Sequence, residues 1–144
     1  RVVSSSLLPA TWNPEPWLHA EPEDGESGAA GGAHQLYAVD MARDGDRLIG
    51  LFTIYRGQEP NRPKLNDVCL GVSTDGVTFK RSYQPIVTRS EVPQAWNYGN
   101  VQGVTGGLIA IDGGYRLYAS GRSGEPGKAT NGVCSMGYRD VVSL

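Results

Sequence analysis

The sequence has little charge and no long hydrophobic run, and both deficits narrow the classes of protein to which it can belong. Only 19% of the 144 residues are charged, the net charge is −2, and no basic run occurs. A surface that binds nucleic acid needs clustered Lys and Arg, so nucleic acid is not an expected partner. No apolar stretch approaches the roughly 18 residues that cross a membrane, so we expect a soluble chain without a membrane partner.

Cysteine and histidine are also scarce, with two of each. Cys69 and Cys134 occupy equivalent places in a repeated pattern, and equivalent points on separate repeats should lie beyond the roughly 7 Å Cα separation of a disulfide. We therefore expect two buried thiols and no bridge. His19 and His34 have no second ligand at metal spacing, and the sequence has no phosphate loop or nucleophile elbow, so it predicts no metal or cofactor.

Turn-forming residues, by contrast, are abundant, with 20 glycines and 9 prolines. Such punctuation favours many short strands over helices, and no segment has a helical period. The sequence therefore predicts an all-β fold. The chain starts at Arg1 without a methionine or a signal-peptide pattern, so we expect a processed product or a fragment.

A phrase that occurs twice indicates how the strands are organised. Asn66-Asp67-Val68-Cys69 is matched 65 residues later by Asn131-Gly132-Val133-Cys134, and an aspartate follows each cysteine after six residues. Each copy lies downstream of an apolar strand pattern that ends in an arginine, Leu51–Arg56 and Leu117–Arg122. Repetition of strands and turns at this spacing predicts blades of a β-propeller, each a four-stranded antiparallel sheet.

The repeat divides the chain into an arm and two blades. Residues 1–35 are expected to form an N-terminal arm with a mobile loop at 21–33, because that segment has almost no large apolar side chain. Residues 36–95 form the first predicted blade, and residues 96–144 form the second. Strands are expected at residues 36–42, 47–55, 67–72, 77–81, 101–111, 115–121 and 133–138.

The motifs of residues 36–144 occur in the order found in a known group of enzymes. Ser73-Thr74-Asp75-Gly76-Val77-Thr78-Phe79 resembles the Asp-box turn of sialidases, one residue shorter than the usual pattern. The other segments that carry the likeness are Tyr37–Met41, Asn66–Leu70, Trp96–Gln102 and Tyr138–Leu144. In these segments the chain resembles five-bladed β-propeller glycoside hydrolases and their relatives near glycoside hydrolase families 32 and 43.

This resemblance implies a glycosidase-like fold and carbohydrate as the partner. The chain departs from the family in length, because five blades need a much longer sequence than two or three. It also lacks a Trp-Met-Asn-Asp-Pro-like motif and an Arg-Asp-Pro motif. The resemblance therefore implies a partial propeller, which the remaining blades of a longer chain or further copies of this one would complete.

Glycoside hydrolysis requires two carboxyl groups at one glycosidic bond, about 5–5.5 Å apart for retention or about 6.5–9.5 Å for inversion. Asp40, on an expected inner strand near the propeller axis, is the first catalytic candidate, and Asp67, after a funnel-side loop, is the second. Both have a structural alternative, in which the carboxylate bonds backbone amides or caps a loop. Glu59 and Glu125 are weaker candidates in corresponding loops, and Asp75 is expected to hold its own turn.

Sugar-binding sites combine flat aromatic rings with a few placed polar groups. Trp96 is the expected stacking platform, and Asn97 and Asn100 are expected to bond hydroxyl groups. Arg56 and Arg122, at the ends of equivalent strands near the funnel, are expected to orient a carboxylate or hydroxyls. The alternatives are core packing for Trp96, and salt bridges or backbone clamps for the two arginines.

These candidates predict a carbohydrate-active protein that binds or hydrolyses glycosides at a propeller funnel and is incomplete alone. An alternative is a non-catalytic module that binds carbohydrate or protein and self-associates through its blades, because isolated blades expose apolar faces and open sheet edges. A truncated enzyme segment without activity of its own is a further alternative.

Overall fold

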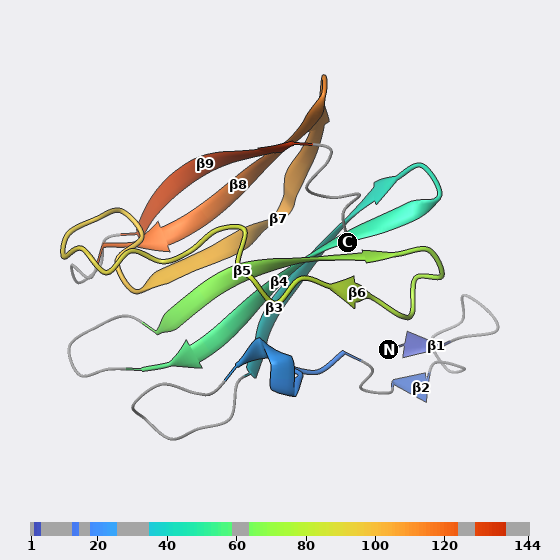
Figure 1. The fold of residues 1–144 in the computed structure, drawn as a ribbon, viewed down its shortest axis with the longest axis horizontal. Coiled ribbons are helices and arrows are strands. Elements are labelled where there is room, and N and C mark those ends of the chain that lie inside the picture. Colours follow the sequence, from blue (N-terminus) through green and yellow to red (C-terminus); the bar gives the residue numbers. More distant parts are fainter. Residues whose placement is uncertain are drawn as a thin grey trace.

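A computed structural model shows how these segments fold (Figure 1). It describes residues 2–3, 13–14, 18–25, 35–58, 64–123 and 129–137. These residues form one 3-10 turn, Pro22–Asp24, and nine strands: β1 (Val2–Val3), β2 (Asn13–Pro14), β3 (Gln35–Asp44), β4 (Arg47–Gly57), β5 (Leu65–Ser73), β6 (Lys80–Arg81), β7 (Asn100–Ile111), β8 (Gly114–Arg122) and β9 (Ala129–Gly137). The predicted all-β character is confirmed for this part of the chain. It contains no helix of membrane-spanning length and hydropathy.

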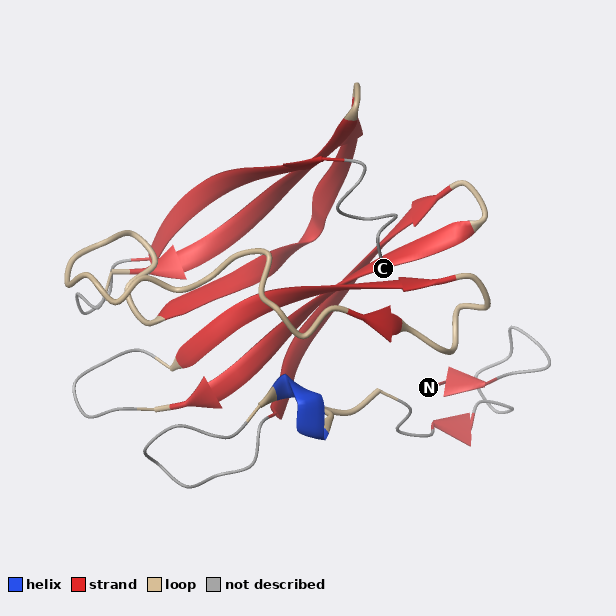
Figure 2. Ribbon diagram, in the orientation of Figure 1, coloured by secondary structure: helices blue, strands red, loops and turns tan. Residues whose placement is uncertain are grey.

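Two antiparallel meanders make up the main sheet (Figure 2). Strands β3, β4, β5 and β6 pair in chain order, and strands β7, β8 and β9 do the same. We call residues 35–81 unit 1 and residues 100–137 unit 2. The units are joined where β5 meets β7 in one parallel pair, Asn66 with Asn100.

A tight turn joins the first strand of each unit to the second, in the gaps between the predicted strands. Gly45, with φ +60°, lies between β3 and β4, and Gly113, with φ +76°, lies between β7 and β8. The left-handed backbone of a short hairpin turn explains why glycine stands at both positions. The fourth strand of unit 1 is shorter than predicted, because β6 covers only Lys80–Arg81.

Asp75 holds the turn between β5 and β6. Its Oδ1 accepts hydrogen bonds from the backbone N–H groups of Thr78 and Val77, both at 2.7 Å, and from the Ser73 hydroxyl at 2.9 Å. The bonds from Thr78 and Val77 lower the pKa of Asp75 to about 2, because they favour the carboxylate. The predicted structural role of Asp75 is confirmed, whereas its predicted counterpart Asp140 lies outside the described residues.

The strand register corrects the sequence alignment of the two units. Phe52 on β4 pairs with Cys69 on β5, and Leu117 on β8 pairs with Cys134 on β9. Because the two cysteines match, Phe52 corresponds to Leu117. The alignment of the two apolar strand patterns made from the sequence is therefore one residue out, and one residue is enough to exchange the faces of a strand.

The two units pack face to face around the main core. The face of unit 1 that enters this core, called face A, carries Ile49, Leu51, Val68 and Leu70. The face of unit 2 that meets it carries Leu108, Tyr115, Leu117 and Ala119. Gly103 lies at the contact, where a Cβ would be 3.7 Å from the Leu51 Cβ and where its N–H donates to Thr53 Oγ1 at 3.3 Å.

The packing is front to back. The opposite face of unit 1, called face B, carries Phe52, Ile54 and Cys69. Since Leu117 corresponds to Phe52, unit 2 uses its own face B to contact face A of unit 1. Equivalent surfaces of the two units therefore do not meet, and the relation between the units is one that can be repeated.

Face B of unit 1 is covered by residues 18–25. Leu18 packs against its apolar cluster, and Asp24 Oδ1 accepts a hydrogen bond from Arg81 Nη2 at 2.7 Å, with both side chains buried. The Arg81 guanidinium in turn lies 4.5 Å from the centre of the Phe52 ring. The sequence predicts a mobile loop from residue 21, whereas in the structure a buried ion pair joins residues 21–25 to a distant strand. Residues 26–33 lie outside the described chain.

Candidate functional site

Polar side chains form a row across one end of the main sheet. At this end β4 and β8 finish, while β5 and β7 begin. Cross-strand pairing joins Tyr55 to Asn66, Asn66 to Asn100, and Asn100 to Arg122. Directly paired residues lie about 4.5–5.5 Å apart, so this strand-end row brings together two of the predicted binding residues, Asn100 and Arg122.

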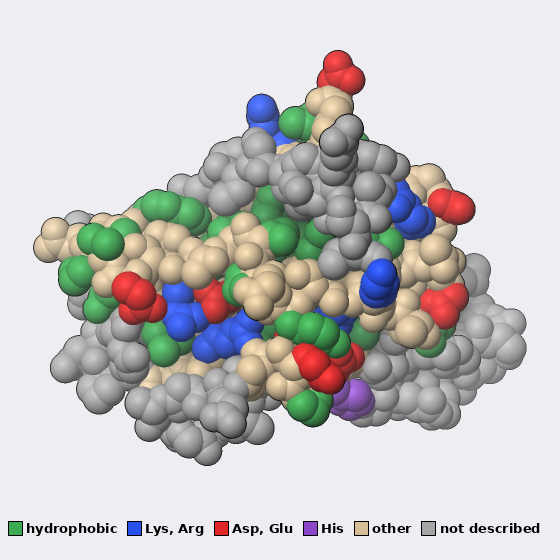
Figure 3. All heavy atoms as spheres, viewed as in Figure 1, with side chains coloured by type: hydrophobic (Ala, Val, Ile, Leu, Met, Phe, Trp, Pro, Cys, Tyr) green, Lys and Arg blue, Asp and Glu red, His purple; other side chains and the backbone are tan. Residues whose placement is uncertain are grey.

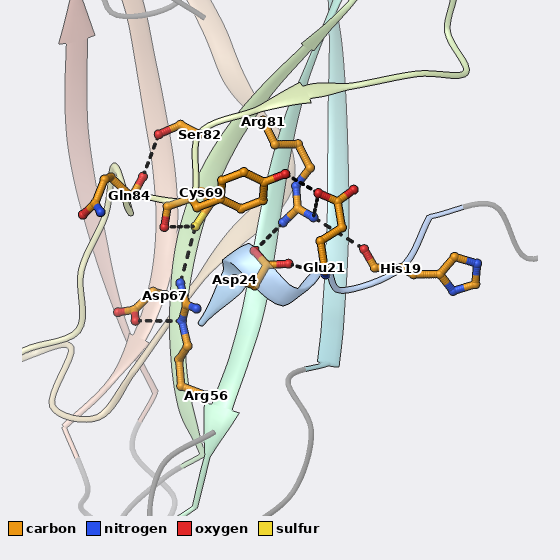
Figure 4. Close-up of polar contacts among 10 residues, drawn as sticks. His19, Glu21, Asp24, Arg56, Asp67, Cys69, Arg81, Ser82 and Gln84 are labelled. Atoms are coloured by element: carbon orange, nitrogen blue, oxygen red, sulfur yellow. Dashed lines mark hydrogen bonds and ion pairs between the residues drawn. The ribbon is translucent and has the colours of Figure 1, made fainter. Parts of the chain in front are cut away.

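Asp67 and Arg56 meet beside this row, in a cluster that also contains Arg89 (Figure 4 shows Asp67 with Arg56). Asp67 Oδ1 accepts the backbone N–H of Arg89 at 2.9 Å, and Oδ2 contacts the Arg89 guanidinium and lies 3.4 Å from Arg56 Nε. The Asp67 side chain is 5% exposed. Two guanidinium groups and an amide thus contact this carboxylate and occupy its acceptor sites.

Cys69 extends the cluster along β5. Arg56 Nη2 donates to the Cys69 sulfur at 3.7 Å, and the thiol donates to the carbonyl oxygen of Tyr83 at 3.8 Å. Burial is the main cause that raises the pKa of the Cys69 thiol to about 11, so the thiol is protonated at neutral pH. The prediction of a buried free thiol is confirmed for Cys69, and the side chain of Cys134 lies outside what the structure describes.

Asp40 lies elsewhere, on the half-buried middle of β3. Its two carboxylate oxygens accept the backbone N–H groups of Gly106, at 3.1 Å, and of Gly107, at 3.2 Å. Both glycines belong to an irregular stretch of β7, where the register with β8 shifts. This arrangement joins β3 to β7 and matches the structural alternative for Asp40, in which the carboxylate bonds backbone amides.

The structure does not bring Asp40 and Asp67 together. Asp40 pairs with Leu51 and Asp67 with Ile54, positions three residues apart on β4, which is about 10 Å along a strand. Leu51 belongs to face A and Ile54 to face B, so the two carboxylates project from opposite faces of unit 1. They cannot flank one glycosidic bond as a pair. Glu59 and Glu125 lie outside the described residues.

The loop of residues 96–100 is built into the join between the units. Trp96 packs against the main core, and its ring lies directly on Gly121, where an added Cβ would be 2.6 Å from Trp96 Cε3. Asn97 Nδ2 donates to the carbonyl oxygen of Thr88 at 2.8 Å. The position of Trp96 is therefore the one expected for its alternative role in core packing.

The Asn66–Asn100 pair leaves polar atoms without a hydrogen bond. Asn100 Nδ2 donates to the carbonyl oxygen of Lys64 at 2.7 Å. Within the described chain, Asn100 Oδ1 and both side-chain polar atoms of Asn66 have no hydrogen-bond partner, although these atoms are buried. An unpaired buried polar group costs about 1–3 kcal/mol, so such atoms mark a place where a polar partner is stabilising.

The register also separates the two predicted binding arginines. Arg56 corresponds to Gly121 of unit 2, so Arg56 and Arg122 are not equivalent, contrary to the expectation from the sequence. Arg56 is largely buried against Asp67, which fits its alternative role in a salt bridge, whereas Arg122 is exposed at the end of β8. Of these two arginines, Arg122 is therefore the one that is accessible from solvent.

Three candidate functional residues are not indicated by any sequence pattern. Arg89 lies in the irregular segment between β6 and β7, where no periodic pattern marks its partner. Tyr37 is the extra residue of a β-bulge on β3, between Leu36 and Ala38, and 45% of the residue is exposed. Lys64 places its Nζ 5.2 Å from the centre of the Tyr37 ring. The pattern of residues 36–42 predicts a strand, but it gives no sign of the bulge that leaves Tyr37 unpaired.

The strand end is more basic than the rest of the chain. Four described cations gather there, Arg56, Lys64, Arg89 and Arg122, against two described acids, Asp67 and Glu91. Figure 3 shows basic side chains in blue around a red carboxylate, left of centre. A local positive charge thus stands against a chain whose net charge is −2.

A cavity of about 310 Å³ lies away from this end, between residues 18–21 and the turn at 77–81. Its two charged lining residues, Glu21 and Arg81, lie 3.8 Å apart, and Arg81 is also paired with Asp24. No group of three or more His, Cys, Asp or Glu that could hold a metal occurs among the described residues. The strand end is therefore the better candidate site. The chain matches no protein-family model, no curated protein and no solved structure.

Proposed function

We propose that units 1 and 2 are successive blades of a β-propeller. The antiparallel order β3–β4–β5–β6, the Asp75 turn between the third and fourth strands, and the front-to-back packing of the two units support this proposal. In such an arrangement β3 and β7 are the inner strands. Asp40 on β3 then links the two inner strands, since its carboxylate accepts hydrogen bonds from the backbone of β7.

We propose that the protein binds carbohydrate at the strand end. The observation that carries the proposal is the strand-end row, which places the exposed Arg122 beside two buried asparagine amides with unpaired polar atoms. Arginine forks and amides are groups that bond sugar hydroxyls and carboxylates in pairs. Binding is better supported than hydrolysis by this chain alone, because Asp40 and Asp67 lie on opposite faces and both accept bonds from the protein.

Two arginines on one strand test the binding proposal. Arg116 and Arg122 are both exposed, and both lie on β8, but only Arg122 is at the strand end. We expect Arg122→Ala to weaken binding in a glycan array and in titration calorimetry roughly 5- to 10-fold, as for the loss of one or two hydrogen bonds, while Arg116→Ala binds as the native protein does. Equal affinities for the two variants would contradict the proposed location.

Hydrolysis is tested separately with aryl glycosides. If the purified chain releases aglycone and Asp40→Asn leaves the rate unchanged, Asp40 is not catalytic and only links β3 to β7. Activity that falls with Asp40→Asn, with the melting temperature unchanged, would favour hydrolysis over simple binding.

A second candidate function is self-association through the units, favoured by the surface of unit 2. Ile109, Ile111 and Tyr118 are exposed on β7 and β8, on the side opposite Leu108 and Leu117. This side corresponds to face A of unit 1, which is covered by a neighbouring unit. We expect Ile109→Glu to reduce any dimer seen by light scattering; a monomer at all concentrations would contradict self-association.

A further inference from the structure

Tyr37 is an aromatic side chain that the fold presents to solvent at the strand end. The β-bulge between Leu36 and Ala38 leaves Tyr37 without a cross-strand partner on β4, and 45% of the residue is exposed. Bulges frequently re-aim a side chain next to a functional site. Since the Trp96 ring lies on Gly121, Tyr37 is better placed than Trp96 to offer a flat face to a ligand.

Lys64 borders this ring and is tied to the strand-end row. Its Nζ lies 5.2 Å from the Tyr37 ring centre, and its carbonyl oxygen accepts the amide of Asn100 at 2.7 Å. The ion pairs of the described chain include none to Lys64, in contrast to Arg56 and Arg89, which share Asp67. Lys64 is therefore a cation that lies over the ring of an exposed aromatic residue and has no ion pair with a described acid.

The charges around the pair favour an anion. Four described cations face two described acids at this end, and one of those acids, Asp67, is buried between two arginines. Glu91 lies 3.3 Å from Arg89 Nε. The exposed cations Lys64 and Arg122 thus have no described acid of their own, so a ligand that brings a negative charge is attracted to this end.

We propose, on the basis of the carbohydrate-binding function above, that the strand end selects acidic saccharides. In this arrangement a sugar ring stacks on Tyr37 while its carboxylate or sulfate pairs with Lys64. An aromatic face supplies the apolar contact of a pyranose, and the ammonium supplies the charge selection. Neutral sugars retain the stacking contact alone and bind more weakly.

The experiment compares ligands that differ in charge alone. Tetragalacturonic acid and its methyl ester share ring, linkage and length, and a sulfated disaccharide with its desulfated form makes a second pair. We expect the native protein to bind at least one acidic member roughly 5-fold more tightly than its neutral partner, as for one accessible ion pair. Tetraglutamic acid serves as the non-sugar anion and is expected not to bind.

Four variants assign the preference to the two residues. Lys64→Gln is expected to reduce the acidic-to-neutral affinity ratio to near 1, and Tyr37→Ala to weaken both ligands roughly 3- to 10-fold. Lys80→Gln and Tyr118→Ala are matched controls, because these exposed residues lie away from the strand end, and they should bind as the native chain does. Circular dichroism and the melting temperature verify folding; if Tyr37→Ala unfolds, the Lys64→Gln ratio decides.

The outcomes separate this inference from the function on which it rests. Equal affinity for acidic and neutral partners, or a preference that survives Lys64→Gln, overturns the inference and leaves carbohydrate binding in place. Tight binding of tetraglutamic acid overturns selection for a saccharide. A native chain that binds no glycan at all overturns both.

Discussion

Removal of the Asp24 carboxylate is expected to unfold the cover of face B and lower the stability of the whole chain. Asp24 and Arg81 are joined at 2.7 Å, and their side chains are 0% and 2% exposed. The N–H of Glu21 also donates to Asp24 Oδ2 at 2.9 Å. Asp24→Ala therefore leaves Arg81 as a buried cation without its closest partner, on top of the Phe52 ring.

The expected loss follows from the cost of an uncompensated buried charge. Breaking a buried ion pair by removal of one partner costs about 3–5 kcal/mol. For a chain of this size each kcal/mol lowers the melting temperature by about 2–4 °C, so we expect a decrease of roughly 6–20 °C. The double variant Asp24→Leu/Arg81→Met removes both charges and is expected to be more stable than Asp24→Ala, because no charge then remains buried.

Urea denaturation followed by circular dichroism measures these differences. Glu23→Ala is the matched control, because Glu23 is an exposed acid in the same 3-10 turn, and its effect should stay within about 0.5 kcal/mol. If Asp24→Ala lowers the free energy of unfolding by no more than Glu23→Ala does, residues 18–25 do not cover face B in solution. A double variant as unstable as Asp24→Ala would refute the charge argument.

Three further outcomes are expected. Gly121→Ala should destabilise the chain by about 1–3 kcal/mol in urea denaturation, because the new Cβ would lie 2.6 Å from the Trp96 ring and 2.8 Å from the Trp96 carbonyl oxygen. Gly103→Ala, where the nearest atom to the new Cβ is 3.7 Å away, should be tolerated. Equal effects of the two substitutions would contradict the packing of Trp96. The Asp75 pKa of about 2 is below the ordinary aspartate value of 3.8, so the contribution of Asp75 to stability should be present above pH 4 and fall as the pH decreases toward 2. An Asp75→Asn variant with the same acid unfolding profile would refute this. The Cys69 pKa of about 11 lies above the ordinary 9.0, so the stabilising effect of the buried thiol should persist below pH 9 and disappear toward pH 11. Alkylation of Cys69 at pH 8 should be much slower in the folded protein than after unfolding. Rapid labelling of the native protein that the Cys69→Ala substitution abolishes would contradict burial.

The strands and turns were accessible from the sequence because their signals are local. Apolar runs, the glycines at 45 and 113, and the Ser73–Phe79 turn each depend on neighbours a few residues away. The register was not accessible, because Leu51-Phe52 and Leu117-Tyr118 look alike in sequence although cross-strand pairing aligns Phe52 with Leu117. Similar residue types at adjacent positions cannot reveal which of them faces the core.

The candidate site was less accessible, since its contacts join distant parts of the chain. Asp67 was identified as a candidate acid, but its partner Arg89 lies 22 residues further on, in a segment without a period. The Arg81–Asp24 pair spans 57 residues and begins in a stretch whose composition predicts disorder. The place of Asp40 on an expected inner strand predicts a carboxylate near the axis, but only the folded chain shows that Gly106 and Gly107 donate to it.

The front-to-back packing has a consequence for symmetry. A contact between two different faces is heterologous, so each added unit presents a fresh copy of the face just buried, and the series ends only when it closes into a ring or meets a cap. In this chain residues 18–25 cover face B of unit 1, and the Asp24–Arg81 ion pair holds them there. The exposed side of unit 2 can therefore receive a further unit, whereas residues 18–25 lie on face B of unit 1. The Asp24→Ala variant, which loses this ion pair, is expected to expose face B as well.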